Sequence, residues 1–84
     1  MDPLKKIGTQ IYAVNKSTID QKLKFGRILV GKIKSYQTLD GKLLPIIQEV
    51  GTKKEIYINA NYFFGELVDA VNALTNKKKK ITIF

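Results

Sequence analysis

Lysine side chains recur at alternate positions in two neighbouring stretches of the chain. Lys22 and Lys24 form one pair, Lys32 and Lys34 form the other, and Arg27 lies between them. Alternate residues of an extended strand share one sheet face, about 7 Å apart, which is close to the spacing of successive phosphates. The pattern predicts a cationic strand face that contacts nucleic-acid phosphates. The alternative is an ordinary solvated face whose lysines discourage strands from associating edge to edge.

Tyrosine rings accompany these cations. Tyr36 has the same strand parity as Lys32 and Lys34, and Tyr57 falls in a later apolar stretch. A ring beside a row of cations can stack on a base, so we predict that both tyrosines belong to the binding surface. The alternative is that each ring packs on the core and leaves its hydroxyl in water.

A run of four cations follows the one stretch of the chain with helical periodicity. Such a run can act as an electrostatic clamp or as a partner-binding tail. Cations at a helix C-terminus also offset the negative end of the helix dipole, but that role accounts for only one or two of them. We therefore add the whole run to the predicted binding residues: Lys77, Lys78, Lys79 and Lys80.

The residue types that usually carry out catalysis or bind metals are missing from the chain. It has no histidine and no cysteine, which excludes the common neutral general base, thiolate chemistry and Cys-based zinc sites. Glu49 and Glu55 lie in adjoining stretches but belong to no catalytic motif. We expect no enzyme activity, no catalytic residue, no metal site and no cofactor.

Charge balance indicates the class of partner. Fifteen Lys and Arg against seven Asp and Glu give a net charge of +8, which attracts polyanions. Arg27 is the one arginine, so attraction to a phosphate backbone should outweigh base-specific recognition. A lysine- and isoleucine-rich composition is also what an AT-rich genome produces.

No apolar run has the length of a membrane span or a signal peptide, so we expect a cytoplasmic protein with no membrane partner.

A β-hairpin over residues 25–50 is the strongest local prediction. Asp40-Gly41 between two apolar, β-branched runs is a typical hairpin turn. Gly26 suggests a bulge, and Pro45 indicates that the second hairpin strand either lies at an edge or is locally bulged there. Further strands are predicted at residues 7–15 and 55–59. Residues 19–25 could form a turn of helix, but their alternation favours a strand that runs into the hairpin with a bend at Gly26.

A helix is predicted over residues 64–74, with an apolar face that includes Leu67, Ala70, Val71 and Leu74. Asn76 is its expected C-cap, and residues 81–84 are expected to form a last strand.

The fold class is therefore mainly β: a small five-stranded antiparallel barrel with one short helix before the last strand, in a single domain over residues 1–84. So small a core leaves a homodimer open as a further source of stability.

The stretches IYAVN, FGRILVGKI, KKEIYI and NYFFGELVDAVNAL together resemble small SH3-like β-barrel proteins of phages, mobile elements and bacteria. The resemblance covers roughly residues 7–74. It implies an SH3-like barrel with a binding role and does not name the ligand.

The leading hypothesis is a non-enzymatic module that binds nucleic acid through the lysine-rich strand face. The alternative is a protein-interaction module, such as a phage-type inhibitor or accessory factor. It would dock an acidic partner on the basic face or add a strand along the edge of residues 42–50. A binder of a small anionic ligand or nucleotide is a third hypothesis.

Overall fold

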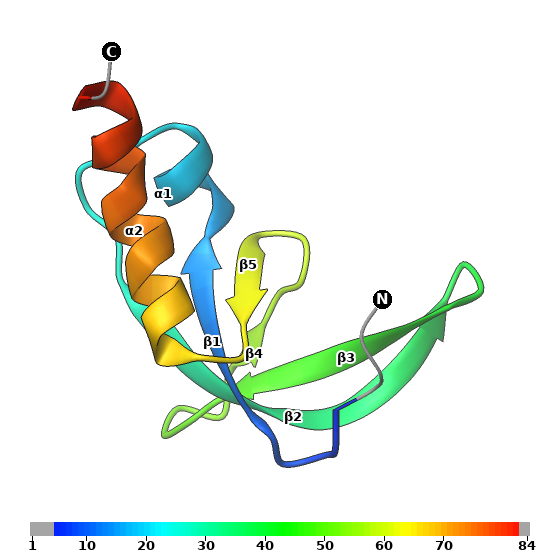
Figure 1. The fold of residues 1–84 in the computed structure, drawn as a ribbon. Helices are drawn as coiled ribbons and strands as arrows, with labels where there is room; N and C mark the ends of the chain where they lie inside the picture. The colour runs from blue at the N-terminus through cyan, green and yellow to red at the C-terminus, as the bar shows by residue number, and fades with distance from the viewer. Residues whose placement is uncertain (1–4, 83–84) are drawn as a thin grey trace.

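Antiparallel strands and two helices make up the described part of the chain (Figure 1). The structure, a computed structural model, describes residues 5–82, and it describes side chains for residues 5–75. In chain order the elements are β1 (Gln10–Asn15), α1 (Lys16–Asp20), β2 (Ile28–Leu39), β3 (Lys42–Glu49), β4 (Glu55–Ile56), β5 (Asn61–Phe64) and α2 (Leu67–Thr82).

All five strands join one antiparallel sheet in the order β4-β3-β2-β1-β5. β1 lies between β2 and β5, so it brings the beginning and the end of the sheet-forming chain together. α2 packs against β1 and β5 and covers this side of the sheet (Figure 1). The prediction of a mainly β fold with five antiparallel strands is confirmed. The described sheet is open, with β4 and β5 at its edges, so the described strands do not close into the predicted barrel.

The β2–β3 hairpin confirms the strongest sequence prediction. Leu39 pairs with Lys42, and the two residues between them, Asp40 and Gly41, have φ values of 51° and 75°. Positive φ at both central positions is the type I′ geometry, whose twist matches that of the flanking strands. In Figure 1 the tip of this hairpin projects away from the rest of the molecule.

The bulge in β2 lies at Lys34 and not at Gly26. The register shifts between Ile33, which pairs with Ile47, and Ser35, which pairs with Ile46. Lys34 is the extra residue, and an extra residue exchanges the two faces of the strand that follows it. Gly26 lies before β2, so the bulge predicted there is wrong.

The core is a small cluster to which the central strands contribute most of the apolar side chains. It consists of Ile11, Ala13, Ile33, Ile47 and Ile56. Burial of each isoleucine side chain contributes about 1.5–3 kcal/mol. Ala70 of α2 is also completely buried, and its small side chain lets the helix approach the sheet closely.

Pro45 occupies a locally unpaired edge, as the sequence predicts. β4 pairs only with Ile47 and Gln48, so the β3 segment around Pro45 has β2 on one side and, among the described residues, no strand on the other. The residues that flank a two-residue turn form a hydrogen-bonded pair. Along the hairpin, hydrogen-bonded pairs then alternate with non-hydrogen-bonded pairs. Pro45 therefore sits at a non-hydrogen-bonded position opposite Tyr36, with its nitrogen facing the open edge. Both β4 and Pro45 obstruct the addition of a partner strand along residues 42–50.

The strand predicted over residues 19–25 is wrong. α1 and an exposed loop over residues 21–27 occupy this part of the chain. Asn15 starts α1 as its N-cap, with its side-chain oxygen accepting a hydrogen bond from the Ser17 N–H at 2.8 Å. Lys22 then takes a φ of 52°, which turns the chain away from the helix.

The C-terminal elements also differ from the prediction. Phe63 and Phe64 belong to β5, because their high β propensity is satisfied by pairing with β1. α2 begins at Leu67, which makes it follow the last strand of the sheet. It continues through Asn76 and Ile81, so the expected C-cap and the strand predicted at residues 81–82 are wrong. Residues 83–84 lie outside the described residues.

Two further predictions are confirmed only in part. The strand predicted over residues 55–59 is limited to Glu55 and Ile56. On α2, the expected apolar face is only partly buried: Ala70 is covered, whereas Leu67 and Val71 are exposed.

Candidate functional site

A groove of about 600 Å³ crosses one end of the sheet. The end of β1, the start of β2, the end of β3, all of β4 and the start of β5 contribute to it, together with α1 and the loop of residues 21–27. Its volume lies in the range of ligand-binding pockets. No single stretch of sequence encodes this site, because five strands meet there.

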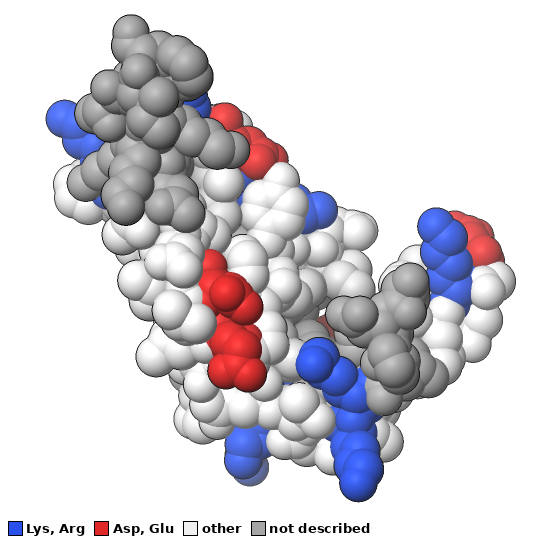
Figure 2. All heavy atoms as spheres, in the orientation of Figure 1, with Lys and Arg blue, Asp and Glu red and all other residues white. Residues whose placement is uncertain are grey.

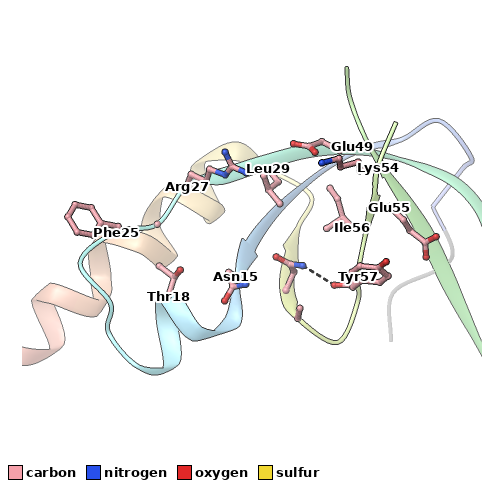
Figure 3. Close-up of a pocket in the computed structure, with 13 residues that line it drawn as sticks. Asn15, Thr18, Phe25, Arg27, Leu29, Glu49, Lys54, Glu55, Ile56 and Tyr57 are labelled. Atoms are coloured by element: carbon pink, nitrogen blue, oxygen red, sulfur yellow. Dashed lines mark hydrogen bonds between the residues drawn. The ribbon is translucent and has the colours of Figure 1, made fainter. Parts of the chain in front are cut away.

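The groove is apolar in its middle and aromatic at its ends. In Figure 3, Phe25 lies at one end of the groove, Leu29 lies in its middle, and Ile56 and Tyr57 lie together towards the other end, where Glu55 also lies. Arg27, which precedes β2, lies along one side of the groove in this view. An extended ligand that lay along the groove would therefore meet a ring at each end and aliphatic side chains between.

Both rings are exposed, and Phe25 is unusually so. Phe25 is 88% exposed and Tyr57 is 68% exposed. A Cβ atom on the neighbouring Gly26 would overlap Thr18 Cγ2 and come within 2.9 Å of Leu74 Cδ2. The backbone at Gly26 is thus pressed against α1 and α2, and Phe25 stands outside this contact.

Cations and carboxylates both line the groove. The guanidinium of Arg27 and the ammonium of Lys54 have no ion-pair partner in the described part of the chain. Glu49 and Glu55 also line the groove, and the Glu49 carboxylate accepts a hydrogen bond from the Thr52 hydroxyl at 2.8 Å. The groove itself therefore carries charges of both signs. The adjoining loop adds two exposed lysines, Lys22 and Lys24.

Two asparagines supply the polar part of the groove. Asn15 and Asn61 are paired across β1 and β5, and both line the groove. Asn15 uses its Oδ1 to cap α1, and Asn61 uses its Nδ2 to donate to the Tyr57 carbonyl at 2.9 Å. The remaining amide atoms are a donor on Asn15 and an acceptor on Asn61.

The predicted lysine stripe is divided between two places. Lys22 and Lys24 lie in the loop after α1, so their prediction as strand residues is wrong, while Lys32 and Lys34 are exposed on β2. The reason is local, because N-capping by Asn15 favours a helical turn where alternation suggests a strand. Figure 2 shows the charged side chains in the orientation of Figure 1. On this face, cations lie along the margin of a largely uncharged surface, and acidic side chains gather over the start of α2.

Tyr36 lies on the opposite face from that predicted. The bulge at Lys34 exchanges the faces of β2, and Tyr36 packs against the core cluster. Its hydroxyl donates a hydrogen bond to the Lys5 carbonyl at 2.5 Å. Tyr36 is therefore occupied in packing, whereas Tyr57 is exposed in the groove.

The remaining tyrosines have structural partners. The Tyr12 hydroxyl accepts a hydrogen bond from Gln10 Nε2 at 2.7 Å. The Tyr62 hydroxyl donates to Asp20 Oδ1 at 2.7 Å, which ties β5 to α1, and this hydrogen bond to a carboxylate raises the pKa of Tyr62. Lys16 Nζ lies 5.5 Å from the centre of the Tyr62 ring.

Sequence reasoning missed Phe25 and Asn61. The available signal for Phe25 was an aromatic residue flanked by Lys24 and by Gly26-Arg27, a composition typical of an exposed binding loop. Nothing local pointed to Asn61. The run 77–80 falls within α2, but its side chains lie outside the described residues.

Comparison with protein-family models, curated proteins and solved structures finds no match. Within the part of the chain that the structure describes, no helix is long and apolar enough to cross a membrane.

Proposed function

We propose that this protein is a non-enzymatic module that binds nucleic acid at the groove and at the adjoining loop of residues 21–27. One observation carries the proposal: three exposed cations, Lys22, Lys24 and Arg27, surround an exposed aromatic residue, Phe25, at the mouth of a groove. Unpaired cations beside an exposed ring are the combination with which proteins hold a phosphate backbone and its bases.

The charge of the whole chain favours the same partner. A net charge of +8 raises the local concentration of polyanions around the protein. Lysine dominates over arginine, so binding should depend mainly on phosphates and only weakly on sequence. A cytoplasmic location, expected from the sequence, is part of this proposal.

We also propose that the fold is SH3-like. Two features support this assignment. β1 pairs with both β2 and β5, and the long strand β2 pairs with β1 near its start and with β3 along most of its length. An SH3-like fold is compatible with binding of nucleic acids, peptides or proteins, so it does not select among ligands.

Protein binding is the second candidate, and the mixed charge of the groove favours it. Glu49 and Glu55 line the groove together with Arg27 and Lys54. A polypeptide segment with charges of both signs would complement them, whereas a phosphate backbone would be repelled by the two carboxylates.

The test compares two double variants that change the net charge equally. Lys22→Glu/Lys24→Glu alters the loop, and Lys32→Glu/Lys34→Glu alters the exposed face of β2. Affinity for a fluorescein-labelled oligonucleotide is measured by anisotropy between about 50 and 200 mM salt. Four phosphate contacts would weaken binding roughly 50- to 150-fold over this range.

We expect the loop variant to lose at least about tenfold more affinity than the strand variant, since only the loop lies at the groove. Equal losses would show that the charge of the whole protein, and not this site, controls binding. An affinity that does not fall with salt, or no binding at about 50 mM, would contradict nucleic-acid binding and favour the protein-interaction candidate.

A further inference from the structure

We infer that the ligand of the groove is single-stranded nucleic acid, with one base stacked on Phe25 and another on Tyr57. This inference rests on the proposed function and specifies the substrate class of the same site. It follows from the kinds of surface that the groove offers at its ends, along its middle and on its polar side.

The exposed ring of Phe25 is the first argument. Burial of a phenylalanine ring stabilises a folded protein, and Phe25 at 88% exposure forgoes nearly all of that stabilisation. The core cluster contains no side chain from this loop. A face of the ring is therefore available to a ligand that itself presents a flat, apolar face. An unpaired base has such a face, whereas the bases of a duplex are stacked on each other.

The separation of the two rings is the second argument. Figure 3 places Phe25 and Tyr57 on opposite sides of Leu29, with Ile56 next to Tyr57. The rings cannot sandwich one base in this arrangement. Each instead offers a separate stacking position, and the aliphatic side chains between them suit the sugars or bases of an intervening strand. The site should therefore require an oligonucleotide longer than one nucleotide.

The two asparagines are the third argument. With one amide atom of each already hydrogen-bonded, Asn15 retains a donor and Asn61 retains an acceptor in the groove. Asn15 is exposed and Asn61 is 8% exposed, so Asn15 is the more accessible of the two, and its amide N–H can meet an acceptor on the Watson–Crick edge of an unpaired base. In a duplex these edges are occupied by the complementary base. The pair therefore suits an unpaired base and predicts little preference among the four.

The cations complete the arrangement. Arg27 and Lys54 line the groove without ion-pair partners among the described residues, and Lys22 and Lys24 extend the positive surface along the loop. A single strand can bend so that its phosphates follow these cations while its bases turn towards the rings. A rigid duplex would present phosphates to the rim and leave both rings without a partner.

The experiment measures anisotropy of labelled dT oligonucleotides of about 2, 4, 8 and 12 nucleotides, and of a duplex of about 12 base pairs, in low salt. The variants are Phe25→Ala and Tyr57→Ala. Leu39→Ala is the matched control, because it removes another exposed apolar side chain (54% exposed) at the hairpin tip, outside the groove. All three side chains are exposed, so circular dichroism should show an unchanged fold.

We expect the longest single strand to bind at least about tenfold more tightly than the duplex and the dinucleotide to bind weakly. Each ring variant should weaken single-strand binding about 5- to 100-fold, and Leu39→Ala should leave it unchanged. If the duplex binds as tightly as the single strand, or if both ring variants bind like the wild type, the inference is overturned while nucleic-acid binding stands. If neither nucleic acid binds in low salt, the proposed function fails together with the inference.

Discussion

Gly26 connects the loop of the groove to both helices, and its missing side chain is the reason it can do so. A methyl group at this position would overlap Thr18 Cγ2 and Leu74 Cδ2. Thr18 is buried and β-branched, so it has little freedom to move aside. We expect Gly26→Ala to lower the free energy of unfolding by about 1–3 kcal/mol in a urea titration.

Gly65→Ala is the matched control for Gly26→Ala. The nearest atom to a Cβ at Gly65 is Lys5 Nζ at 3.4 Å, the end of a flexible side chain. This variant should unfold at nearly the wild-type urea concentration. Similar losses in both variants would show that the contact with the helices is not what makes glycine necessary at residue 26.

Tyr62 reports on the contact between α1 and β5. Its hydrogen bond to Asp20 raises its pKa above the ordinary value of 10.0, because the neutral phenol can donate to the carboxylate and the phenolate cannot. The stabilisation from this bond is complete below the ordinary pKa and disappears as the pH rises through the raised pKa. We expect Asp20→Asn to move the Tyr62 titration towards lower pH, measured as the difference in phenolate absorbance between each protein and its Tyr62→Phe counterpart. An unchanged titration would mean that the hydrogen bond is absent in solution.

At the scale of elements, the turn of the β2–β3 hairpin depends on left-handed backbone conformations. Gly41 has a φ of 75°, and a Cβ atom added to it would meet no other atom within 4 Å. The positive φ, and not a lack of space, therefore requires glycine at this position. Alanine in this conformation is strained by about 1–2 kcal/mol, and asparagine tolerates it better. We expect thermal stability to fall in the order wild type, Gly41→Asn, Gly41→Ala. Equal stability of the two variants would contradict a left-handed conformation at residue 41.

The hairpin could be predicted from sequence because its determinants are local. Asp40-Gly41 and the apolar runs beside it are sufficient to define the turn and the two strands. α1 depends instead on one capping hydrogen bond from Asn15, which competes with a strand-like alternation of Leu23 and its neighbours. β5 has no such local signal, because its pairing with β1 joins residues far apart in the chain.

The bulge at Lys34 shows the same difference between local and non-local information. One extra residue in β2 moves Tyr36 from the lysine face to the core, yet nothing in the sequence around it shows where the register shifts. Lys32 and Lys34 are exposed strand residues, as predicted, because they precede or form the bulge. The prediction for Tyr36 is wrong because this residue follows the bulge.

At the scale of the whole molecule, positive charge is largely uncompensated. The net charge is +8, and the cations of the groove have no ion-pair partners among the described groups. Self-repulsion of this kind destabilises the compact state and is screened by salt. We expect Tm, measured by circular dichroism, to rise between about 10 and 150 mM sodium chloride.

The strand variant Lys32→Glu/Lys34→Glu provides the comparison, because it halves the net charge. Its Tm should depend less on salt than that of the wild type. A wild-type Tm that falls with added salt would show that attractive charge pairs outweigh the repulsion.

The groove itself could be predicted only in part. Arg27 is predicted as a binding residue from its place among the alternating lysines, whereas Lys54 is not. The groove itself exists because five strands end together, which no local pattern shows. The residue type of Tyr57 is enough to make it a candidate. Asn15 and Asn61 become neighbours only through the register of β1 with β5, which sequence patterns do not encode.

Pro45 has a consequence for the behaviour of the protein at high concentration. The segment of residues 43–47 is apolar and carries no charge, which apart from its proline is the composition of segments that stack into cross-β fibrils. Because the proline nitrogen faces the open edge of β3, a second chain that approached this edge would find no N–H group there. Pro45 thus removes one donor from the open edge of a protruding hairpin, which disfavours the growth of a cross-β ladder along this apolar segment.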